Sequence, residues 1–193
     1  MFKYFNLIII SFINISLFAE DTIIKEAESY LVKDFQELVF ISIKKQRLYH
    51  IKNNKIINKY IISSSKYGVG NKEGSNKTPL GIHKIKEKHG EKTPINGIMI
   101  GRIFYGNIAE IYTDKTESKT DDITTRILWL EGLEKGKNLG PGIDSYERYI
   151  YIHGTSEEGK LGEPASNGCI RMKNKDIFDL YKKLEVGTLV LIL

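Results

Sequence analysis

Cysteine is nearly absent from this sequence, because Cys169 is the only one among 193 residues. A single cysteine cannot close a disulfide within the chain, so the fold must be stabilised by its hydrophobic core. Metal-ligand patterns are absent as well, since the four histidines form no His-Glu-x-x-His motif and no cysteine pair exists. We therefore expect no metal site.

Clustered charge is also lacking. The formal net charge is +5, but the lysines are scattered singly rather than gathered into a basic stripe. Nucleic-acid binding requires such a stripe or a recognisable module, so we expect no nucleic-acid partner. With 41% hydrophobic and 27% charged residues, the composition is typical of one globular domain with its own core. The sequence carries no signal for an oligomeric state.

The N-terminus is strongly apolar. Residues 1–19 carry Lys3 near the start and end at Ala19 before Glu20, which is typical of a secretory signal peptide. Polar residues interrupt this stretch, which makes it short for a membrane span. Leu17 stands where cleavage prefers a small residue, so an uncleaved membrane anchor is the alternative. We expect an exported protein of the periplasm or cell envelope, with no further membrane contact.

The rest of the chain alternates apolar and polar residues over short segments, which predicts a mainly β fold. We expect a β-sandwich or irregular barrel with minor helices. Residues 20–37 are predicted to form an N-terminal helical extension, with its helix over 22–37, before a single domain at 38–193. A late helix is predicted from Asn174, as its N-cap, to about Leu184. The expected strands are 39–43, 47–51, 56–62, 82–86, 97–103, 107–112, 125–130, 148–152 and 189–193.

The single thiol lies in a chemically suggestive context. Cys169 follows small residues, and His153 ends an apolar segment sixteen positions upstream. A thiolate is the reactive form of cysteine, and an imidazole within hydrogen-bond reach can take the thiol proton. A buried structural cysteine with an unrelated histidine is the alternative. An exported lone thiol is prone to oxidation, so its presence is easier to understand if the sulfur does chemistry. A redox role would need a second cysteine to resolve it.

The residues around this pair resemble the signature of the YkuD-type L,D-transpeptidase catalytic domain. That signature is His-Gly, a loop, and Ser/Thr-x-Gly-Cys-x-Arg. Two further elements are similar to family features: Gln46-Arg47-Leu48-Tyr49 to the opening hairpin, and Thr78-Pro79-Leu80-Gly81 to the Thr-Pro-x-Gly element. The resemblance covers residues 38–193. The residues that match the signature are His153, Gly154, Ser166, Gly168, Cys169 and Arg171.

The resemblance implies a role for each residue at the reaction centre. Cys169 is expected to be the nucleophile and His153 the general base and acid. The main-chain N–H groups of Gly168 and Cys169 are expected to form an oxyanion hole. The carbonyl of Gly154 is expected to orient the imidazole. Ser166 is expected to hydrogen-bond inside the loop as a structural support.

Two residues are expected to contact substrate. Arg171 can bind a substrate carboxylate bidentately, and tying down the loop is its equally weighted alternative. Asn167 stands where many family members carry a histidine, and it cannot carry a proton at neutral pH. The segment Thr125–Leu130 has no assigned role: it is either a core strand or a cleft wall with Trp129 at its mouth. The tyrosines at 146, 149 and 151 are expected in the core and at the rim.

The implied function is that of a cell-wall cysteine acyltransferase without a cofactor. Such an enzyme attacks the L,D bond of a peptidoglycan tetrapeptide stem, forms a thioester on Cys169 and passes the acyl group to an amine, which gives a 3-3 cross-link or a related product. If water resolves the thioester, the enzyme is an L,D-carboxypeptidase that leaves tripeptides. An alternative of another class is a non-catalytic wall-binding module that has kept the fold.

Overall fold

The structure is a computed structural model that describes residues 20–31 and 35–193. The expected signal peptide at 1–19 therefore lies outside the described residues. Among the helices of the described ranges, none combines the length and the apolar character needed to cross a bilayer.

Strands dominate the described chain, together with a helix at residues 20–30, a 3₁₀ turn η1 (Glu158–Lys160) and the helix α2 (Asn174–Lys183). The strands are β1 (Glu37–Ser42), β2 (Arg47–Lys52), β3 (Lys55–Ser63), β4 (Gly81–His89), β5 (Gly97–Ile100), β6 (Ile103–Ile108), β7 (Thr124–Gly132), β8 (Tyr151–Gly154), β9 (Ile170–Met172) and β10 (Leu189–Ile192).

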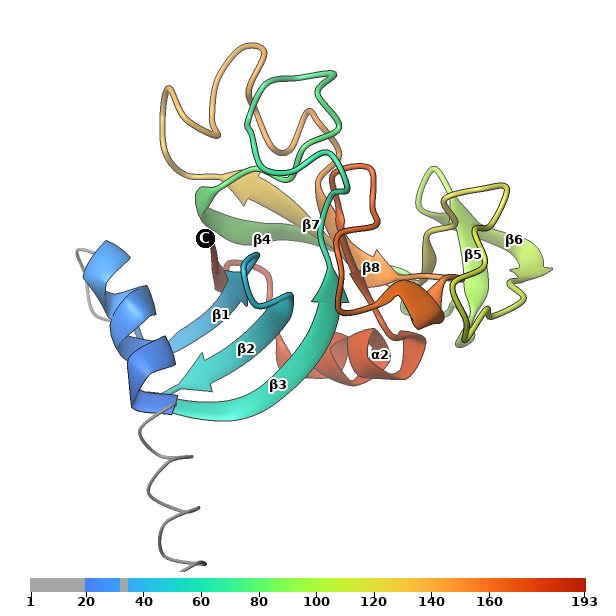
Figure 1. Cartoon of the computed structure of the whole chain (residues 1–193), viewed down its shortest axis with the longest axis horizontal. Helices are drawn as coiled ribbons and strands as arrows, with labels where there is room; N and C mark the ends of the chain where they lie inside the picture. Colours follow the sequence, from blue (N-terminus) through green and yellow to red (C-terminus); the bar gives the residue numbers. More distant parts are fainter. Residues whose placement is uncertain (1–19, 32–34) are drawn as a thin grey trace, which may run out of the picture.

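These strands form one sheet in the order β4-β10-β1-β2-β3-β9-β8-β7-β5-β6, and a second pairing of β4 with β7 closes it into a ring. β5 and β6 stay outside the ring as a projecting hairpin (Figure 1). Most pairings are antiparallel, but β1 with β10 and β8 with β9 are parallel. The expected mainly β fold is confirmed, and of its two forms the irregular barrel is the one observed.

Alternating residues of the same strands fill two separate cores. On β1, Val39 and Ile41 point into the barrel, whereas Leu38 and Phe40 pack on the outer face. The helix at 20–30 covers that outer face and buries Ala27. A strand covered on both sides has to be apolar throughout, which explains the uninterrupted run Leu38–Ile41.

A third cluster lies outside the barrel, over β7 and β8. Leu128 and Leu130 of β7 belong to the barrel core, while Ile127 and Trp129 face outward. The projecting hairpin covers these outward residues with side chains that include Met99. The segment Thr125–Leu130, whose role the sequence left open, is thus a core strand that also presents Trp129 to an outer face.

Several element boundaries differ from expectation. The helix expected over 22–37 spans 20–30, and β1 already begins at Glu37. The single strand expected at 97–103 is divided by a turn at Gly101 and Arg102, both with positive φ. No strand continues over 109–112. β8 begins at Tyr151 rather than at residue 148, because Tyr149 has a φ of 56° that interrupts an extended strand.

Asn174 is not the N-cap of α2. The N-cap position belongs to Lys173, whose side chain makes no capping bond, and Asn174 is the first helical residue. Its amide instead joins two strands: Oδ1 accepts from Thr124 Oγ1 at 2.6 Å and Nδ2 donates to the Thr155 carbonyl at 2.8 Å. Asn174 therefore fastens the helix start to the ends of β7 and β8.

Core truncation on β7 tests this account of the barrel. Leu128 is fully buried, so Leu128→Ala should lower the free energy of unfolding by about 2–5 kcal/mol through lost burial and a residual cavity. The matched control is Val186→Ala at an exposed position, which should stay within about 0.5 kcal/mol. Urea denaturation followed by circular dichroism measures both, and equal effects would contradict the assigned core.

Candidate active site

Parallel pairing of β8 and β9 brings the histidine and the cysteine to the same face of the sheet. In this pairing Ile152 lies beside Ile170, and His153 lies beside Arg171. Cys169 directly precedes β9, so the same register sets it next to Tyr151. Because side chains alternate along a strand, His153 and Cys169 project to the outer side while the two isoleucines enter the barrel.

The sulfur of Cys169 is held by the backbone of the segment before and within β8. Its S–H donates to the Tyr149 carbonyl at 3.3 Å, and the Tyr151 N–H donates to Sγ at 3.4 Å. The residue is partly exposed and packs against the cluster that contains Trp129. Burial of the sulfur raises the pKa of Cys169 to about 12, so the resting group at neutral pH is the thiol.

His153 is 2% exposed, and its ring is oriented by its own neighbour. Nδ1 donates to the Gly154 carbonyl at 2.7 Å, which leaves Nε2 as the unprotonated nitrogen. Burial lowers the pKa of His153, and the nearby carboxylate of Asp121 opposes that shift. The imidazole is therefore neutral at neutral pH and has a free acceptor nitrogen. This contact is the one assigned to Gly154 from sequence, and its role in a reaction stays a prediction.

Ser166 shapes the turn that carries the sulfur. Its hydroxyl donates to the Cys169 carbonyl at 2.6 Å and accepts the Gly168 N–H at 3.2 Å. Gly168 has a φ of 127°, a conformation that side-chain-bearing residues rarely adopt. The N–H of Gly168, expected in an oxyanion hole, is thus already bonded to Ser166 in this state.

The two satellite motifs support the same turn. The Thr78 hydroxyl donates to the Gly168 carbonyl at 2.9 Å and accepts the Ser65 N–H at 3.0 Å. The Gln46 amide binds both the N–H and the hydroxyl of Ser64, at 2.9 and 2.8 Å. The Ser64 carbonyl in turn accepts the Ser166 N–H at 2.9 Å. Residues far apart in the sequence therefore brace the cysteine turn from the turn before β2, the residue after β3 and the loop before β4.

Arg171 is 3% exposed and is occupied by two protein carboxylates. Nη1 donates to Glu157 at 2.7 Å and Nη2 donates to Asp121 at 2.6 Å. Asp121 also accepts from the Asn167 amide at 2.8 Å. This geometry favours the tie-down alternative for Arg171, because both of its terminal nitrogens are engaged inside the protein. Asn167 is exposed beside the turn and is held by the same carboxylate.

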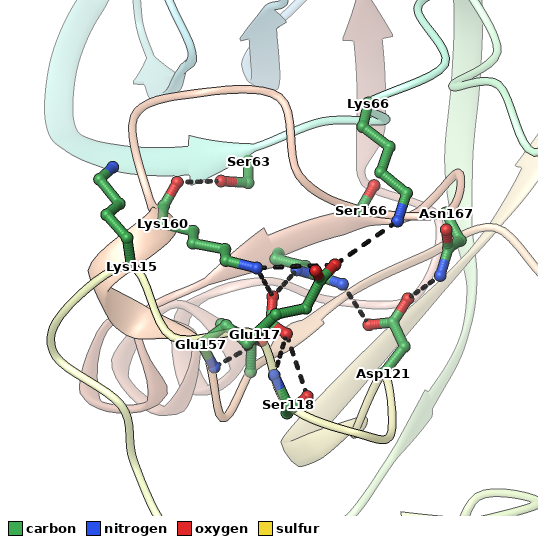
Figure 2. A network of polar contacts seen from close by, with 12 residues as sticks. Ser63, Lys66, Lys115, Glu117, Ser118, Asp121, Glu157, Lys160, Ser166 and Asn167 are labelled. Carbon is green, nitrogen blue, oxygen red and sulfur yellow. Dashed lines mark hydrogen bonds and ion pairs between the residues drawn. The ribbon is translucent and has the colours of Figure 1, made fainter.

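Residues 113–122 form a polar, mostly exposed segment, which ion pairs and hydrogen bonds fasten to the site. Glu117 lies 3.7 Å from both Lys66 and Lys160, and the Ser118 N–H donates to Glu157 at 2.7 Å (Figure 2). Sequence reasoning missed Asp121 and Glu157 as site residues. The one available signal was the arginine of the cysteine motif, since a buried guanidinium requires anionic partners.

A cavity of about 220 Å³ lies beside the cysteine turn, although neither Cys169 nor His153 lines it. Its lining includes Tyr149, whose carbonyl accepts the thiol, and Asn167, two residues before Cys169. Arg148 also lines it and donates to the Lys77 carbonyl at 2.7 Å. A larger cavity of about 590 Å³ lies between the helix at 20–30 and β2–β3, and neither the histidine nor the cysteine lines it.

An aromatic wall flanks the other side of the sulfur. Trp129 stacks on Tyr146 with ring centroids 4.1 Å apart and meets Tyr151 edge-on at 5.4 Å. The Arg102 guanidinium lies 4.5 Å from the Trp129 ring centroid and donates to the Tyr151 hydroxyl at 3.1 Å. Tyr149 is exposed at the rim. Within residues 20–31 and 35–193, no three His, Cys, Asp or Glu side chains converge as metal ligands.

Comparison with known proteins identifies a family. The model of the L,D-transpeptidase catalytic domain, YkuD, matches residues 36–192. The putative L,D-transpeptidase YqjB of Bacillus subtilis (strain 168) is 51% identical over 45 residues, which are 23% of this chain and 26% of that protein. The putative L,D-transpeptidase YkuD of the same organism is 46% identical over 65 residues, 31% of this chain and 40% of that protein. The chain thus spans less than half the length of these curated relatives.

Solved structures share the fold at low sequence identity. The L,D-transpeptidase from Xylanimonas cellulosilytica DSM 15894 has a TM-score of 0.52 and 18% identity, covering 85% of this chain and 63% of that one. L,D-transpeptidase 3 from Mycobacterium tuberculosis, in complex with a faropenem-derived adduct, has a TM-score of 0.50 and 15% identity, covering 81% and 60%.

Alkylation kinetics test the protonation state of the sulfur. Because the pKa of Cys169 is raised to about 12, its reaction with iodoacetamide should be slow at pH 7 and should keep rising above pH 9. The same chain unfolded in urea is the control, and its rate should level off above the ordinary thiol pKa of about 8.5. If the alkylation rate of the folded chain levelled off below pH 8, the thiolate would already be present at rest.

Removal of the Asp121 charge tests its influence on the pair. The carboxylate raises the pKa of Cys169, so Asp121→Asn should lower that pKa and speed alkylation at pH 9 by about 3- to 10-fold. The control is Asp122→Asn, which removes a charge at the next position. The Asp122 side chain makes none of these contacts, so the alkylation rate should stay unchanged. An unchanged rate in Asp121→Asn would contradict the electrostatic link.

Proposed function

Because the chain belongs to the family of L,D-transpeptidase catalytic domains, we propose that it is a cysteine acyltransferase that acts on peptidoglycan stem peptides. The observation that carries the proposal is the placement of Cys169 and His153 on one face of two adjacent parallel strands. The imidazole there presents a free Nε2, because Nδ1 is committed to the Gly154 carbonyl. Acyl transfer through sulfur requires at least a nucleophile and a general base that can activate it.

The reaction starts from a neutral pair. Burial keeps the Cys169 proton on sulfur and the His153 ring uncharged. Attack on the carbonyl of the L-centre therefore proceeds as the thiol leaves the Tyr149 carbonyl and transfers its proton to Nε2. A C–S bond forms, and the imidazolium then protonates the departing D-residue amine as the C–N bond breaks. A thioester on Cys169 and a neutral imidazole remain.

The oxyanion of the tetrahedral intermediate needs donors that are held in place beforehand. The N–H of Cys169 is the donor we assign first, because the turn around it is fixed by Ser166 and Thr78. The Gly168 N–H joins only if its bond to Ser166, at 3.2 Å, is exchanged for the substrate oxygen. Ser166 and Gly154 thus act as positioning residues on either side of the reacting atoms.

Asp121 and Arg171 act on the His153–Cys169 pair without taking part in bond formation themselves. The Asp121 carboxylate favours the imidazolium that forms when His153 accepts the proton. Arg171 fixes Asp121 against the cysteine turn by a bond of 2.6 Å. Asn167, on the cavity side of the turn, is the residue we assign to substrate contact, since its carbonyl oxygen remains available while its amide binds Asp121.

The proposal includes a location and a division of the chain. A peptidoglycan substrate places the enzyme outside the cytoplasmic membrane, in the periplasm or cell envelope. Residues 1–19 would direct export as a signal peptide or remain as an anchor. Residues 20–37 would form an extension, and 38–193 the catalytic domain. No cofactor is proposed.

Two rival functions are an enzyme that differs only after the thioester has formed and a binding module that forms no thioester. Resolution by water makes the protein an L,D-carboxypeptidase with the same residues in the same roles. The exposed rim around Tyr149 admits an acceptor amine and water alike, so the product decides between transfer and hydrolysis. A wall-binding module without activity would need neither an oriented imidazole nor a braced sulfur, and both features argue against it.

Product analysis with disaccharide-tetrapeptide tests the proposal. The wild-type chain should yield dimers of increased mass, whereas a carboxypeptidase would yield tripeptides, and mass spectrometry distinguishes them. Cys169→Ala should abolish both products, and His153→Ala should reduce turnover by about 10²–10⁴ through loss of the base. Thermal melting must show that both variants fold.

Carbapenem labelling separates the enzyme from the binding module. An L,D-transpeptidase named LdtMt1 has been solved in complex with imipenem, so we expect imipenem to add its mass to this chain at Cys169. Ser156→Ala is a control, because Ser156 precedes the η1 turn and its hydroxyl has no partner in the described chain. Retained wall binding with an inert thiol and no product would overturn the enzymatic proposal.

A further inference from the structure

Tyr149 has a backbone conformation that aromatic residues rarely adopt. Its φ of 56° lies in the left-handed region, where glycine and asparagine are common and bulky side chains are outliers. Such outliers cost free energy and gather at functional sites, where the surrounding contacts hold them in place. Tyr149 is also the residue whose carbonyl accepts the Cys169 thiol, at 3.3 Å. The unusual conformation and the contact with sulfur therefore occur at one residue.

A tight turn that ends at Ile150 fixes this conformation. The Tyr149 N–H donates to the Tyr146 carbonyl at 3.0 Å, and the Ile150 N–H donates to the Ser145 carbonyl at 3.1 Å. These two bonds have the pattern of a Schellman motif, in which the residue at the position of Tyr149 is usually glycine. At the start of the turn, the Asp144 carboxylate accepts the Tyr146 N–H at 2.8 Å. The turn is thus closed by hydrogen bonds at both ends.

Packing on either side of Tyr149 keeps the turn in this state. Ile150 is 3% exposed in the barrel core, and its carbonyl accepts the Leu130 N–H of β7 at 3.0 Å. The Tyr149 ring stacks on Trp129 with centroids 5.6 Å apart, although the residue is 56% exposed. The burial of Ile150 and the stacking of the ring together offset the cost of a left-handed tyrosine.

The direction of one peptide group follows from this turn. The peptide bond between Tyr149 and Ile150 is trans, so its C=O and N–H point in opposite directions. Because the Ile150 N–H is directed at the Ser145 carbonyl, the Tyr149 carbonyl is directed to the other side, where Cys169 lies. A thiol has a single proton, so one that donates to this carbonyl does not at the same time donate to His153. The turn therefore decides which acceptor the resting thiol uses.

We propose that Tyr149 is a positioning residue for Cys169: its left-handed backbone holds the resting thiol on the Tyr149 carbonyl and away from His153. An extended Tyr149 would rotate that peptide group and release the thiol proton for Nε2 of the imidazole. Tyr149 also lines the cavity beside the cysteine turn, so a ligand in that cavity would contact the residue that holds the thiol. The catalytic meaning of this contact rests on the proposed function, but the contact itself belongs to the resting protein.

Raman spectroscopy of the S–H stretch tests the contact directly, because Cys169 is the only thiol of the chain. Donation to a carbonyl lowers the wavenumber of this stretch. At pH 7, the wild-type band should therefore lie at lower wavenumber than the band of the same chain unfolded in guanidinium chloride. Cys169→Ala should remove the band, which confirms its assignment.

Two substitutions separate the backbone from the ring. Both Tyr149→Asn and Tyr149→Val remove the ring, but asparagine tolerates a left-handed φ, whereas a β-branched residue is an outlier there. Tyr149→Asn should keep the wild-type band, and Tyr149→Val should shift it to higher wavenumber. Tyr149→Val should also speed alkylation by iodoacetamide at pH 8 by about 3- to 10-fold, since loss of a bond to the neutral thiol lowers the thiol pKa. Tyr105→Val, at a tyrosine 65% exposed on β6, is the matched control and should change neither readout.

Three results would overturn the inference. The first is a wild-type band that coincides with the band of the unfolded chain, a comparison that needs no variant. The second is an unshifted band in Tyr149→Val that folds by circular dichroism, and if this variant does not fold, the other two comparisons still decide. The third is an upward shift in Tyr149→Asn, which would assign the effect to the ring. None of these measurements uses substrate, so a chain without acyltransferase activity can pass them and an active chain can fail them.

Discussion

Parallel pairing of β8 with β9 is the constraint on which the whole site depends. It sets His153 beside Arg171, and it brings Cys169 next to Tyr151 at the entrance of the adjacent strand. The inner residues of the same two strands, Ile152 and Ile170, are fully buried in the barrel core. Burial on one face therefore fixes the register that aligns the chemistry on the other, since a slip of one residue would exchange the two faces.

Desolvation sets the character of the pair. It lowers the pKa of His153 and raises that of Cys169, so both groups are uncharged at rest. Asp121 raises the pKa of both groups, which strengthens the base and keeps the proton on sulfur until attack. A lone thiol in this state is also less prone to oxidation than a resting thiolate would be. Protection and reactivity thus follow from the same two causes, the burial of the pair and the charge of Asp121.

The parts of the site that could be predicted from sequence lie in short continuous motifs. The parts that were missed come from residues far apart in the sequence or from backbone geometry. The histidine and cysteine motifs are short runs, and the strands around Val39 and Leu128 follow from short apolar runs. β9 was missed because its three residues lie inside the cysteine motif. Asp121 and Glu157 were missed because they meet Arg171 only through the fold. Positive φ angles at Gly101 and Tyr149, which periodicity does not report, shifted the strand ends.

The protonation state of the resting pair is the central claim, and nitrogen-15 NMR of the histidine ring measures it most directly. We predict that at pH 7 His153 shows a protonated Nδ1 and an unprotonated Nε2, and that Cys169→Ala leaves this pattern unchanged. A doubly protonated ring at pH 7 that becomes neutral in Cys169→Ala would reveal a thiolate–imidazolium pair and contradict the account.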